Sequence, residues 1–88
     1  MQFDDISDPV HDGADLEKQG KYKEALEIYR EAVKQDPGNS AVWWALGDLY
    51  VRSRQKNAAI YCFEQVLKLD HPNPQLTDWL EKYKAAQP

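Results

Sequence analysis

The chain has 88 residues, 42% of them hydrophobic and 30% charged, and its formal net charge is −4. A chain of this length forms one small domain, and no run approaches the roughly 18 apolar residues that a membrane-spanning helix needs. Lys and Arg are scattered among Asp and Glu instead of forming one basic stripe, which argues against nucleic-acid binding.

The N-terminal segment MQFDDISDPV is acidic and lacks the basic start and apolar core of a secretory signal. Cys62 is the only cysteine, so no internal disulfide can form. Both observations favour a reducing cytoplasm. Residues 1–7 show no apolar stripe at helical spacing, and we expect a loose leader there, followed by a single domain over residues 8–88.

The first helix is predicted by its end signals. Asp8 followed by Pro9 indicates an N-cap with proline in the first helical position, where its missing N–H costs nothing. The helix is expected to run to about Gln19. Gly20 is then expected in the left-handed conformation that commonly ends a helix.

The chain repeats itself with a period of 34 residues. After the first helix we expect a second from Tyr22 to the turn at residues 36–38, a third from about Ala41 to Arg52 and a fourth from about Asn57 to Leu69. A shift of 34 residues aligns the first helix with the third and the second with the fourth. Asn39 or Ser40 is the expected N-cap of the third helix. The aligned pairs are Gly13 and Gly47, Ala25 and Ala59, Leu26 and Ile60, Tyr29 and Phe63, Val33 and Leu67, Asp36 and Asp70, and Asn39 and Asn73.

The two repeats also differ. Arg54 occupies the place of Gly20, and a left-handed arginine would cost about 1 kcal/mol relative to glycine. The first helix is more polar, as expected of a terminal capping unit. It has Pro9, Asp12 and Leu16 at the places of Trp43, Leu46 and Tyr50.

The second repeat resembles a tetratricopeptide repeat, written W-x2-L-G-x2-Y, A-x3-F, P, on the residues Trp43, Leu46, Gly47, Tyr50, Ala59, Phe63 and Pro72. The resemblance implies an all-α, right-handed superhelical solenoid of antiparallel helix pairs. Repeat one would cover residues 6–39 and repeat two residues 40–73. A shift of 34 residues from Pro37 leads to residue 71, so Pro72 lies one residue after the position that the period predicts.

A fifth helix is expected from Asn73 and Pro74 to about residue 86, as a cap on the second repeat. Its apolar residues recur at i, i+3, i+4 and i+7, which is the spacing of one helix face. They are Leu76, Trp79, Leu80 and Tyr83. We expect Trp79 and Tyr83 to lie in the core.

Proteins of this family are interaction scaffolds without catalytic residues of their own, so the resemblance implies an adaptor that binds a peptide or helix of a partner protein. The first helix of each pair lines a concave groove in this architecture. Here that face would carry Val10, Ala14, Glu17, Ala41, Trp44, Asp48, Val51, Arg52, Gln75, Asp78 and Lys82.

Trp44 is the strongest single candidate for a partner contact. It is turned about 100° from Trp43, which matches the repeat signature and is expected in the core. Trp44 would then project into the groove as an aromatic anchor. The alternative is that it packs on Leu16 or Leu76 of the neighbouring helices.

Two alternatives for the partner can be weighed. Family members that hold acidic chaperone tails use a carboxylate clamp of lysine, asparagine and arginine. This chain has other residues at the matching places, so chaperone tails are disfavoured; they are Val10, Ala14, Ala45, Gln75 and Trp79. Two and a half repeats fall short of the three usually needed, which leaves self-association into a homo-oligomer as the second hypothesis.

The sequence gives only weak evidence for a catalytic or metal-binding site. His11 and Asp15, like Asp8 and Asp12, are four residues apart, a spacing that could hold a divalent ion. Acidic residues are also favoured at a helix N-terminus by its dipole, and we prefer that explanation. His71 has no ligand partner at a suitable spacing, and no phosphate loop or nucleophile motif is present. We expect no enzyme activity, no cofactor and no metal.

Overall fold

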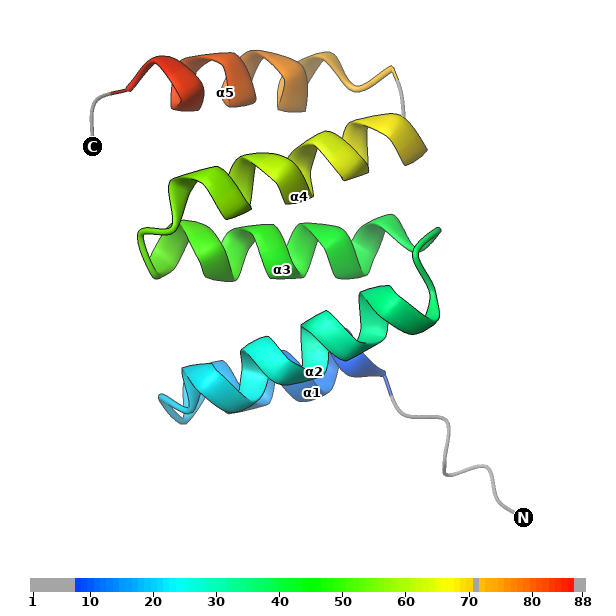
Figure 1. The fold of residues 1–88 in the computed structure, drawn as a ribbon, viewed down its shortest axis with the longest axis vertical. Coiled ribbons are helices and arrows are strands. Elements are labelled where there is room, and N and C mark those ends of the chain that lie inside the picture. The colour runs from blue at the N-terminus through cyan, green and yellow to red at the C-terminus, as the bar shows by residue number, and fades with distance from the viewer. Residues whose placement is uncertain (1–7, 71, 87–88) are drawn as a thin grey trace.

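The computed structural model describes residues 8–70 and 72–86, which form five α-helices (Figure 1). The leader expected over residues 1–7, and His71, lie outside the described residues. Every helix begins and ends within about a residue of its expected position. The helices are α1 (Pro9–Lys18), α2 (Tyr22–Gln35), α3 (Ser40–Arg52), α4 (Lys56–Leu69) and α5 (Pro74–Ala85).

Three helices begin at the side-chain caps expected from the sequence. Asp8 accepts hydrogen bonds from the backbone N–H groups of Val10 and His11, at 3.1 and 3.4 Å. Asn39, rather than Ser40, caps α3, and Asn73 caps α5 by accepting from the Leu76 N–H at 3.1 Å. These caps satisfy backbone donors that have no partner inside the helix.

The turn inside each helix pair depends on one left-handed residue. Gly20, between α1 and α2, has φ +79°, as expected. Arg54, between α3 and α4, has φ +63°, so the second repeat makes the same turn with a residue that bears a side chain. The 34-residue period therefore extends to the backbone geometry of the turns.

The helices pack as antiparallel pairs, α1 with α2 and α3 with α4, and Figure 1 shows them stacked in chain order with α1 behind α2. The two pairs meet where α2 packs on α3, and α1 also approaches α3. At the other end α5 packs on α4 alone, and its backbone does not come close to that of α3. The fold is the helical solenoid expected from the sequence.

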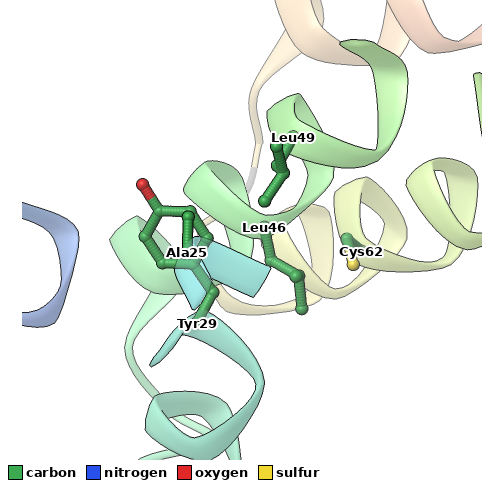
Figure 2. Close-up of a cluster of buried hydrophobic side chains, with 5 residues drawn as sticks. All are labelled: Ala25, Tyr29, Leu46, Leu49 and Cys62. Carbon is green, nitrogen blue, oxygen red and sulfur yellow. The ribbon is translucent and has the colours of Figure 1, made fainter. Parts of the chain in front are cut away.

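The core consists of two clusters. The first is drawn in Figure 2 and joins side chains of α2, α3 and α4, namely Ala25, Tyr29, Leu46, Leu49 and Cys62. The second joins α4 and α5 through Phe63, Val66, Leu76 and Leu80. Trp43 is half-buried, packs against both clusters and donates its indole N–H to the Pro37 carbonyl at 2.8 Å.

The prediction that Trp79 and Tyr83 lie in the core was wrong for Trp79. Its side chain is 40% exposed, and Tyr83 is half-buried. The buried residues of α5 are Leu76 and Leu80, which face α4. An apolar stripe that spans i to i+7 is wider than the strip that one neighbouring helix covers, so the Trp79 ring at its edge stays partly exposed.

Candidate partner-binding groove

Trp44 on α3 and Trp79 on α5 face a common hollow of about 410 Å³. Phe63 of α4 lies between them, and two amide side chains and one carboxylate complete the lining. We call this hollow the aromatic groove and define it by Trp44, Asp48, Phe63, Asn73, Gln75, Leu76 and Trp79. It exists because α5 packs on α4 without closing against α3.

The aromatic rings of the groove form a continuous series of contacts. The centroid of Phe63 lies 5.3 Å from that of Trp44 and 5.1 Å from that of Trp79, with interplanar angles of 88° and 69°. Tyr83 stacks on Trp79 at 4.9 Å and 14°. Such edge-to-face and stacked pairs fix ring orientation. Both indoles are therefore held in place while remaining 45% (Trp44) and 40% (Trp79) exposed.

A polar network lies beside the groove and links the two repeats. Arg52 of α3 forms ion pairs with Glu17 of α1 at 2.6 Å and with Asp48 at 2.9 Å. The hydroxyl of Tyr29 donates to the other Glu17 oxygen at 2.7 Å. Burial, and then this hydrogen bond to Glu17, raise the pKa of Tyr29 far above its usual range. The network positions Asp48 at the edge of the groove.

Of the residues expected on the concave face, Trp44, Asp48 and Gln75 come together in the aromatic groove, and Glu17 and Arg52 lie beside it. The sequence left open whether Trp44 projects into the groove or packs on Leu16 or Leu76. In the structure Trp44 is 45% exposed, and Leu76 lines the same groove.

The remaining expected residues do not line this groove. Asp78 and Lys82 form an exposed ion pair with each other at 3.3 Å, and Asp78 borders a separate depression near Pro72. Val51 packs against the second core cluster. Val10 and Ala14 are half-buried on α1, and Ala41 is exposed at the start of α3.

Sequence reasoning missed four of the lining residues, Phe63, Asn73, Leu76 and Trp79. A signal for Trp79 was present, because it stands at one of the places that match the carboxylate clamp and hence on the concave side. Its apolar character led to its assignment to the core. Phe63 belongs to the repeat signature and is buried, and it also forms part of the groove lining from α4.

Other candidate sites have little support in the described residues. Nowhere in ranges 8–70 and 72–86 do three or more His, Cys, Asp or Glu side chains cluster closely enough to hold a metal ion. His11 and Asp15 form an exposed contact at 3.5 Å. Burial raises the pKa of the Cys62 thiol to about 12, which keeps it protonated and poorly reactive at neutral pH. None of the described helices is long and apolar enough to cross a bilayer.

Comparison with known proteins agrees with the repeat architecture. A family model described as tetratricopeptide repeat matches residues 16–83, which include the end of α1, the whole of α2, α3 and α4, and most of α5. A search of curated proteins finds no match. The matched segment covers well over half of the chain.

Proposed function

Because the chain belongs to the tetratricopeptide repeat family, whose repeats generally mediate protein–protein interaction, we propose that it is an adaptor that binds a peptide or helix of another protein. The partner segment would lie in the aromatic groove. We propose no catalytic role. A cytoplasmic location remains a prediction from the sequence.

One observation carries this proposal: two exposed indoles from different helices converge on one buried phenylalanine. Tryptophan is enriched among the residues that dominate binding energy at interfaces, and such residues cluster in pockets. Phe63 holds both rings, so little conformational entropy is lost when a partner covers them. Asp48 and the two amide side chains supply the polar groups that orient a ligand.

The proposal is tested by selecting peptides from a random library displayed on phage against the immobilised protein. Peptides enriched on the natural sequence should fail to bind Trp44→Ala. Tyr22→Ala is the matched control, because it removes a comparably exposed aromatic ring outside the groove. Circular dichroism should show equal helicity in all three proteins. Equal capture by Trp44→Ala would refute the assignment of the groove.

A further inference from the structure

Asp48 is the one ionisable side chain among the seven residues that define the aromatic groove. The other six are three aromatic residues, one leucine and two amides. The Asp48 side chain is 47% exposed, so its carboxylate is accessible from the hollow. The groove therefore presents a single negative charge beside two indoles.

The Asp48 carboxylate is only partly neutralised by its neighbours. Among residues 8–70 and 72–86 its one cationic partner is Arg52, which makes the shorter contact, 2.6 Å, with Glu17. The Glu17 side chain is only 10% exposed. Two carboxylates thus share one guanidinium, and this group of three residues carries a net charge of −1. Asp48 makes the longer of the two contacts with Arg52 and is the more exposed carboxylate, so its charge is the one that a ligand in the groove would meet.

An exposed indole face beside a carboxylate favours a cation. The face of an aromatic ring is electronegative and attracts ammonium and guanidinium groups, with tryptophan the strongest of the aromatic residues. A guanidinium is planar, so it can stack on an indole while it donates hydrogen bonds to a carboxylate. An acidic side chain in the same place would meet repulsion from both Asp48 and the ring faces.

We propose that the aromatic groove binds an arginine side chain of the partner peptide, with the guanidinium against an indole of Trp44 or Trp79 and hydrogen-bonded to Asp48. This inference rests on the proposed function and adds the chemistry of the partner: a basic segment instead of an acidic tail. The chemical basis is the charge of the groove and the orientation of its rings.

The sequences of the selected peptides give the first test. Peptides that bind the natural protein and fail to bind Trp44→Ala should be enriched in arginine over the unselected library, and depleted in aspartate and glutamate. Peptides that depend on Trp44 but show no arginine enrichment would overturn this inference and leave the proposed function standing. If no selected peptide depends on Trp44, both are wrong.

The second test isolates the charge pair. One selected peptide is synthesised with arginine and with citrulline, its neutral isostere, and titrated by the change in tryptophan fluorescence. Citrulline lacks the positive charge and has a carbonyl oxygen in place of one terminal amino group, so it should weaken binding about tenfold. Asp48→Asn should weaken binding of the arginine peptide by a similar factor and leave the citrulline peptide nearly unaffected.

The matched control is Glu31→Gln, which removes an equal charge from an exposed ion pair on α2, away from the groove. It should bind the arginine peptide as the natural protein does. If Glu31→Gln weakens binding as much as Asp48→Asn, the effect comes from overall charge and the contact with Asp48 is refuted. Equal binding of the citrulline and arginine peptides would refute it as well.

Discussion

Gly13 of α1 lies so close to the Tyr29 ring of α2 that a β-carbon built on it would stand 2.2 Å from the ring. The second repeat has the same relationship between Gly47 and Phe63, where the distance would be 2.9 Å. Both distances are shorter than real contacts of a β-carbon. In each repeat, the glycine allows the ring of the second helix to pack directly on the backbone of the first.

Replacement of Gly13 by alanine should destabilise the fold. Tyr29 is fully buried and hydrogen-bonded to Glu17, so its ring cannot move aside without loss of that bond. Overpacking costs about 1–3 kcal/mol, against up to about 1 kcal/mol that alanine gains over glycine in a helix. Urea unfolding should show a lower midpoint for Gly13→Ala.

Two further alanine substitutions serve as comparisons for the change in the unfolding midpoint. A β-carbon added at Gly38 would have no atom within 4 Å, so Gly38→Ala should change the midpoint of urea unfolding little. Gly47→Ala should cost less than Gly13→Ala, because its β-carbon would stand 2.9 Å from the Phe63 ring, whereas that of Gly13→Ala would stand 2.2 Å from the Tyr29 ring. Unchanged stability of Gly13→Ala would show that the close approach is not a constraint.

The left-handed residues of the two turns give a reciprocal pair of substitutions. Arg54→Gly should stabilise the fold by up to about 1 kcal/mol, because it relieves the cost of a side chain at φ +63°. The greater freedom of glycine in the unfolded chain offsets part of the gain. Gly20→Arg should destabilise by a similar amount, since nothing lies within 4 Å of Gly20 to clash with a side chain.

Thermal unfolding of both variants measures this effect. A lower melting temperature for Arg54→Gly would indicate that the arginine side chain makes a compensating contact.

The fold should lose stability in alkaline solution. The pKa of Cys62 rises from 9.0 to about 12 on burial, so above pH 9 the unfolded chain releases a proton that the folded chain retains. The unfolded state then binds fewer protons, and the free energy of unfolding falls by up to about 1.4 kcal/mol per pH unit. Tyr29, whose pKa is also raised, adds a further loss above pH 10.

Urea unfolding between pH 8 and pH 10 measures that slope, and Cys62→Ala is the comparison. The variant lacks the thiol, so its stability should fall less steeply with pH whatever its absolute value. Identical slopes would show that the thiol of Cys62 does not contribute.

Light scattering after gel filtration separates the adaptor hypothesis from self-association. We expect a monomer at two protein concentrations roughly tenfold apart, with the aromatic groove open in each copy. A dimer that Trp44→Ala dissociates would instead make the groove the contact between two copies of this chain.

Local signals in the sequence were sufficient to predict the helices. Three helices begin at a side chain that caps the helix directly following it, namely Asp8, Asn39 and Asn73. Gly20 likewise determines the turn in which it lies. These features can be recognised without knowledge of distant residues. The 34-residue period added the pairing of the helices, because equivalent apolar residues must face equivalent neighbours.

The composition of the groove was harder to predict because it depends on which neighbours are present. The periodicity of α5 identifies its apolar side but not how much of that side α4 covers, and so Trp79 was placed in the core. Likewise, the contact between Glu17 and Arg52 joins residues 35 positions apart and follows from how one repeat stacks on the next. The sequence around Glu17 or Arg52 contains no local pattern that predicts this contact.

The two walls of the groove differ in how firmly they are held. The wall that carries Trp44 belongs to α3, which is enclosed by α1, α2 and α4, whereas the wall that carries Trp79 belongs to α5 and rests on α4 alone. A ligand pressed between them therefore acts on one stiff and one compliant surface.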